Sequence, residues 1–79
     1  MANDLVWDRR MLELFKAAAF LTDEEELVLK DWVRKKSIIN TAMIHHMSER
    51  KINYIRKQIR QKYDRVQVYI PDLPPRRTR

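Results

Sequence analysis

Two adjacent histidines, His45 and His46, stand just before Ser48 and are the first residues whose types could do chemistry. Neighbouring helical residues point about 100° apart, so adjacent imidazoles do not converge on one metal ion, and helical ligand pairs stand three or four residues apart instead. The chain has no cysteine to complete a metal site. Catalysis by histidine needs a nucleophile and an orienting partner, and Ser48 is better explained as a helix cap. We therefore predict no metal site, no cofactor and no catalytic residue, and a protein that is not an enzyme.

A corner between two helices explains the same stretch better. Ser48 is a typical N-cap residue, and Met47 and Ile52 have the spacing of a hydrophobic staple around it. The preceding helix must then end at His46, and histidine is one of the few residues besides glycine that tolerate the left-handed conformation of such a turn. His45 falls on the buried side of that helix. The stretch therefore predicts a helix-turn-helix corner.

Two helices are expected before this corner. Apolar residues at helical spacing predict the first from about Asp4 to Phe20, with Asn3 or Asp4 as its cap. Its apolar arc is wider than one thin core needs. The second helix opens at Thr22, which forms a capping box with Glu25 in the sequence Thr-Asp-Glu-Glu.

The helices on either side of the corner complete the domain. A short third helix follows the N-cap Ser37, and a fourth covers residues 48–63. The fourth helix has one apolar face, formed by Ile52, Ile55, Ile59 and Tyr63, and an opposite face formed by Arg50, Tyr54, Lys57 and Gln61. After residue 65 the sequence alternates with period two and then contains three prolines, which predicts an extended basic tail over residues 66–79. Residues 1–65 form a single helical domain, made of an N-terminal helix (1–20) and a tri-helical unit (21–65).

Composition favours the same fold class. The 79 residues contain no glycine, which disfavours hairpin turns and rules out a glycine-rich phosphate loop within this sequence. We expect an all-α, four-helix domain that contains a helix-turn-helix and carries an extended C-terminal arm. The longest apolar run is far shorter than the roughly 20 residues of a membrane span, so we expect no membrane association and a cytoplasmic protein.

Charge is unevenly distributed. The net charge of +6 combines a net −4 over residues 1–33, a net +8 over residues 34–65 and a net +2 over residues 66–79. A basic half on an acidic half is typical of a protein that binds nucleic acid, although a solvated basic face kept for solubility would give the same count.

From Leu21 to Tyr63 the chain resembles the helix-turn-helix DNA-binding domain of LuxR-type regulators and of the C-terminal region of bacterial sigma factors. The positions that match the LuxR-type pattern are Leu21, Thr22, Glu25, Val28, Leu29, Ser37, Ala42, Ser48, Ile52, Ile59 and Lys62. The departures are Lys35 in place of glycine, Thr41 in place of isoleucine, His45 in place of leucine and Ile55 in place of histidine. The resemblance implies a small stand-alone bacterial or phage protein that binds double-stranded DNA.

If the fourth helix lies in the major groove, its N-terminal half faces the bases. The expected base-reading residues are Arg50, Lys51, Asn53, Tyr54 and Lys57. Arginine suits guanine and asparagine suits adenine. The expected phosphate contacts are Arg34, Lys35, Lys36, Ser37, Ser48, Arg56 and Arg60.

Two other functions remain open. The chain could be a protein-interaction module that docks on RNA polymerase or another protein through its first helix and tail. The same helix is also a candidate homodimer surface, and its expected contact residues are Trp7, Met11, Leu14 and Phe15. RNA binding is weaker, because only Tyr54 offers an aromatic ring on the basic face.

Overall fold

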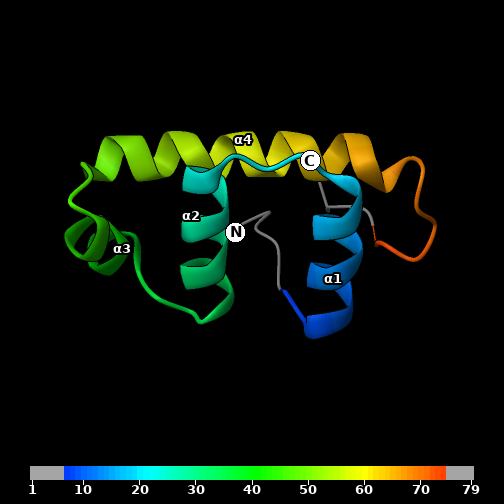
Figure 1. Cartoon of the computed structure of the whole chain (residues 1–79), viewed down its shortest axis with the longest axis horizontal. Helices are drawn as coiled ribbons and strands as arrows, with labels where there is room; N and C mark the ends of the chain where they lie inside the picture. The colour runs from blue at the N-terminus through cyan, green and yellow to red at the C-terminus, as the bar shows by residue number, and fades with distance from the viewer. Residues whose placement is uncertain (1–6, 75–79) are drawn as a thin grey trace.

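The computed structural model describes residues 7–74 and contains four helices and no strand in that range. The helices are α1 (Arg9–Ala18), α2 (Asp23–Val33), α3 (Ile38–His45) and α4 (Glu49–Gln67). The other three helices pack on α4 and lie on one side of it in Figure 1. The expected all-α, four-helix architecture is therefore confirmed. No helix in the described range is long and apolar enough to cross a membrane.

The first helix is shorter than predicted. Its N-cap is Asp8, whose carboxylate accepts a hydrogen bond of 2.8 Å from the amide of Met11. The expected caps Asn3 and Asp4 lie outside the described residues, but the extended backbone at Asp8 shows that the helix starts after it. The helix ends at Ala18, because Ala19 is again extended.

The caps of the next three helices are those that the sequence predicts. Thr22 and Glu25 form both halves of the capping box, and the Ser37 and Ser48 hydroxyls each accept from the third amide of their helix. His46 ends α3 in the left-handed conformation, at φ 56°. These four termini fix where the chain turns.

Aromatic side chains fill the centre of the core. The Trp7 ring packs against Phe15, Trp32 and Tyr63, with ring centroids 5.3, 6.0 and 5.7 Å away. Phe15 is fully buried, Met11 is buried and Leu14 is half-buried against the same cluster. The predicted partner surface is therefore wrong for Met11 and Phe15, and the half-buried Trp7 and Leu14 pack against the same core. Most of the wide apolar arc of α1 is covered by the chain's own core.

The predicted extended tail is wrong for the part that the structure describes. Helix α4 continues to Gln67, and the chain then folds back so that Leu73 is fully buried in the core. Gln67 and Tyr63 donate hydrogen bonds to the carbonyls of Leu73 and Pro74. Burial, helped by the nearby carboxylates of Asp64 and Asp8, raises the pKa of Tyr63. The domain therefore extends to at least residue 74, and residues 75–79 lie outside the described range.

Candidate nucleic-acid interface

A tight corner joins α3 to α4. The residues between the two helices are His46, Met47 and Ser48. The Met47 amide donates to the Ala42 carbonyl at 2.9 Å, which closes the left-handed turn. Beyond the corner, Ile52, Ile55, Ile59 and Tyr63 are all buried, as the sequence predicts. The apolar side of α4 therefore faces the other helices, and the opposite side faces solvent.

The outward side of α4 carries four of the five predicted base-reading residues in the expected arrangement. Arg50, Asn53, Tyr54 and Lys57 are all exposed, and the Tyr54 ring is 61% exposed. We call these four residues, with Gln61 at the next helical turn, the outward face. None of the four takes part in a hydrogen bond or ion pair with another side chain among residues 7–74. Their guanidinium, amide, phenol and ammonium groups are therefore available to a ligand.

Lys51 is directed elsewhere. Its ammonium group forms an ion pair of 2.8 Å with Glu24, near the start of α2. Both side chains are about half exposed, so this is a surface pair of small energy. Lys51 can reach a ligand only by leaving Glu24.

Arg56 and Arg60 do not point into solvent as a phosphate contact would. Their guanidinium groups lie over the Trp32 ring, with the Arg56 and Arg60 Cζ atoms 4.6 and 5.2 Å from its centroid. Arg56 is buried and also donates to the Lys36 carbonyl at 3.3 Å. Stacking on an aromatic face is favourable for a guanidinium. Arg56 therefore belongs to the core side of α4, and its predicted role as a phosphate contact is wrong.

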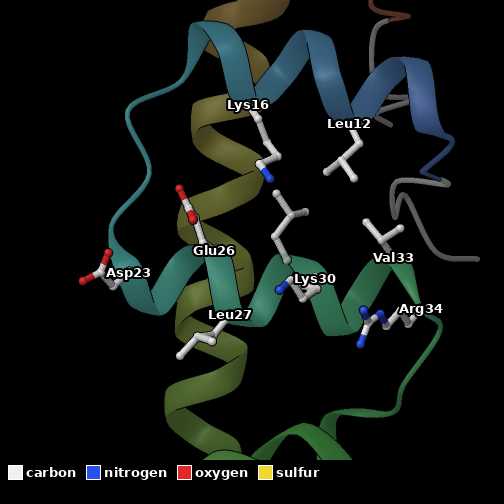
Figure 2. A pocket seen from close by; sticks show the side chains of 9 residues that line it. Leu12, Lys16, Asp23, Glu26, Leu27, Lys30, Val33 and Arg34 are labelled. Carbon is white, nitrogen blue, oxygen red and sulfur yellow. The ribbon is translucent and has the colours of Figure 1, made fainter.

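The three basic residues of the loop between α2 and α3 lie in different environments. Lys35 is exposed and adopts a positive φ of 64°, while the Lys36 carbonyl is held by Arg56. Arg34 lines a groove between α1 and α2, as Figure 2 shows. Lys35 and Lys36 do not line this groove and remain candidates for phosphate contact.

The two serines cap their helices as the sequence predicts. The hydroxyls of Ser37 and Ser48 accept hydrogen bonds of 3.0 Å from the amides of Asn40 and Lys51. Each hydroxyl accepts in this bond, so its own O–H remains able to donate to a phosphate oxygen. The backbone amides of the two helix starts can donate to the same phosphate.

The histidine pair is explained by structure. The His45 Nε2 atom lies 2.9 Å from the Asp31 carboxylate in a half-buried site, so His45 joins α3 to α2. His46 is exposed at the turn. Among residues 7–74 no group of three or more His, Cys, Asp or Glu side chains could hold a metal ion.

The sequence analysis did not predict which basic side chains of α4 are paired with other parts of the fold. Lys62 donates to the Phe20 carbonyl and to Glu25 at 2.6 and 2.5 Å, although Glu25 already serves the capping box. The position of the Trp32 ring beneath two arginines is a tertiary contact that the sequence analysis did not predict. A usable signal was the position of Arg56, four residues after Ile52 and three before Ile59, on the buried arc.

Comparison with protein-family models, curated proteins and solved structures found no match to this chain.

Proposed function

We propose that this protein binds double-stranded DNA in a sequence-specific manner, with the outward face of α4 in the major groove, and that it acts as a cytoplasmic regulator of transcription. One observation carries the proposal. A helix that follows a three-residue left-handed corner presents Arg50, Asn53, Tyr54 and Lys57 to solvent, and none of these side chains is used by the fold in the described range. These residue types match the donor and acceptor patterns of guanine and adenine edges.

The backbone gives the LuxR-type resemblance further support. Lys35 stands where that pattern has glycine, and Lys35 has the positive φ that glycine would serve. Thr41 stands where the pattern has isoleucine, and it is fully buried. These two departures therefore fall at positions whose environment suits the residue of the pattern.

Binding to random duplex DNA at about 50 and 200 mM salt, followed by selection of enriched sequences, tests the proposal. The logarithm of affinity falls by about 0.9 per phosphate neutralised for each unit of log salt. Only a few cations of α4 are available, so we expect a modest slope, together with an enriched motif. A slope without a motif would limit the function to phosphate binding. No binding at either salt would overturn the proposal.

A matched pair of variants assigns the surface. Arg50→Ala with Lys57→Ala should weaken binding by at least about 10-fold, because each good base contact contributes about 1–3 kcal/mol. Arg9→Ala with Arg10→Ala also removes two positive charges, from exposed positions on α1 outside the groove, and should change affinity by less than about threefold, by the general charge effect alone. Equal losses in both variants would show that net charge, not the outward face, carries the binding.

A second candidate, a module that docks on RNA polymerase or another protein, is favoured by α3. This eight-residue helix leaves Ile39, Met43 and Ile44 between 49% and 69% exposed. Exposed apolar residues on one short helix are typical of a protein contact. Replacing Met43 with Glu should abolish partner capture and leave DNA binding unchanged if this candidate is correct.

A further inference from the structure

The groove between α1 and α2 has an apolar floor and a charged rim. Its volume is about 520 Å³. Leu12, Leu29 and Val33 form the floor, and Leu27 stands beside them with 40% of its surface exposed. The groove exists because α1 and α2 pack chiefly on α4 rather than on each other (Figure 1). An apolar groove with a charged rim is suited to receive another helix.

The rim has an ordered charge pattern along α2. Asp23, Glu26, Lys30 and Arg34 follow one stripe of the helix, and Leu27 lies beside this stripe on the side away from α1 (Figure 2). The sequence of charges is therefore negative, negative, positive, positive. None of the four forms an ion pair or side-chain hydrogen bond within residues 7–74, although Glu26 and Lys30 have the spacing of an intrahelical pair. The helix dipole favours this order of charges but does not explain the exposed leucine or the apolar floor.

This pattern is complementary to itself when two copies of α2 run antiparallel. A two-fold axis near the middle of the helix places Glu26 opposite Lys30 of a second copy and Asp23 opposite its Arg34. A parallel arrangement would instead place like charges together. Two-fold dimers are the commonest homo-oligomers, and they require such a self-complementary patch.

We propose that this groove is a homodimer interface in which a second copy of this chain docks with its α2 antiparallel to the first. Four charge pairs and two copies of Leu27 meet across the axis. The groove is small, so the dimer is at the weak end of specific interfaces and forms at micromolar concentrations.

The arrangement has a geometric consequence. Helix α2 begins beside α4 and runs away from it in Figure 1. A two-fold axis that reverses α2 therefore reverses the direction of the outward face as well, so the dimer presents its two outward faces on opposite sides. With the DNA binding proposed above, such a dimer joins two DNA segments rather than two half-sites of one.

Sedimentation velocity without DNA tests the interface, from about 5 to 300 µM chain, a range that spans micromolar dissociation constants. The wild-type protein should shift from monomer to dimer. Glu26→Lys or Lys30→Glu alone should remain monomeric, since each sets like charges against each other twice. A 1:1 mixture of the two variants restores both pairs and should form a heterodimer, detected with a fluorescent label on one variant. Glu13→Lys makes the same charge change on an exposed part of α1 outside the groove and should dimerise as wild type does.

A wild-type protein that stays monomeric throughout this range would overturn the proposal. So would single variants that dimerise normally, or a mixture that stays monomeric while circular dichroism shows both variants folded. Because no DNA is present, failure here leaves the proposed DNA binding standing, and failure of DNA binding leaves the dimer standing.

Discussion

The basic residues of α4 fall into two groups that the fold treats differently. On the inner side, Arg56 and Arg60 lie on Trp32, and Lys62 is bound to Glu25. On the outward face, Arg50 and Lys57 have no partner among the described residues. The inner cations stabilise the packing of α2 on α4, whereas Arg50 and Lys57 are free to attract a ligand. Net charge alone therefore overstates the electrostatic attraction that this helix can exert.

The largest expected effect on stability comes from replacing Trp32, whose ring lies beneath Arg56 and Arg60. Trp32→Ala should lower the free energy of unfolding by about 3–5 kcal/mol, since it removes a large core ring as well as both cation–π contacts. That loss is comparable with the whole stability of a small domain. Urea unfolding followed by circular dichroism measures it. Trp32→Phe keeps a ring and should lose much less; equal losses in the two variants would mean that the ring does not hold the arginines.

Arg56 on the inner side and Lys57 on the outward face are neighbours in the sequence, so their substitutions compare the two groups directly. Arg56→Ala should cost about 1–3 kcal/mol of stability, because a buried guanidinium loses its ring and its carbonyl partner. Lys57→Ala should change stability by less than about 0.5 kcal/mol, as exposed substitutions usually do.

DNA affinity, measured under conditions in which both variants are folded, should show the reverse order. Lys57→Ala should weaken binding several-fold, and Arg56→Ala should leave it near the wild-type value. A stronger effect of Arg56→Ala on affinity would return Arg56 to the contact surface.

Tyr63 gives the inner side of α4 a pH dependence. The raised pKa of Tyr63 means that its neutral form is favoured in the folded state. Its contribution is therefore complete below the ordinary tyrosine pKa of about 10 and is lost as pH rises through the folded value. Urea unfolding at pH 8 and pH 11 should show a smaller alkaline loss for Tyr63→Phe than for wild type. At pH 8 the variant should cost about 0.5–1.5 kcal/mol for the lost hydrogen bond to Pro74. Identical alkaline losses would exclude Tyr63 as the titrating group.

The smallest expected effect comes from releasing Lys51 from its ion pair with Glu24, so that it joins the cations that are free to bind DNA. Glu24→Gln removes the ion-pair partner of Lys51 and should raise DNA affinity by about two- to fivefold, with one more counterion in the salt slope. Glu13→Gln makes the same charge change on exposed α1 and serves as the control. If both variants gain equally, Lys51 makes no specific contact.

Local signals predicted the corners of this fold well. The caps at Thr22, Ser37 and Ser48 and the left-handed turn at His46 depend on side chains within three residues of the backbone that they satisfy. A sequence shows such short-range chemistry directly. The same holds for the four outward residues of α4, whose exposure follows from helical periodicity once Ile52, Ile55 and Ile59 are placed inside.

Contacts between distant segments were not predictable in this way. The arginines on Trp32 join residues more than 20 positions apart, and no local pattern indicates that the ring is within reach. The prediction of an extended tail over residues 66–79 was wrong for a related reason. Prolines after residue 70 correctly predicted the end of regular structure, but not that Leu73 would return to the core and be fully buried with Tyr63 and Phe15. Helix α1 starts later than predicted because Asp8 can serve as an N-cap as well as Asp4 can.

The central position of α4 also bears on how the chain acquires its structure. Helices α1, α2 and α3 all bury their apolar sides on residues 49–67. Isolated helices of 8 to 11 residues are marginal in water. During synthesis α1, α2 and α3 therefore lack the surface on which they bury their apolar sides until α4 has followed them, so we expect these four helices to fold together. Until α4 has been made, the apolar sides of the first three helices stay open to chaperones and proteases.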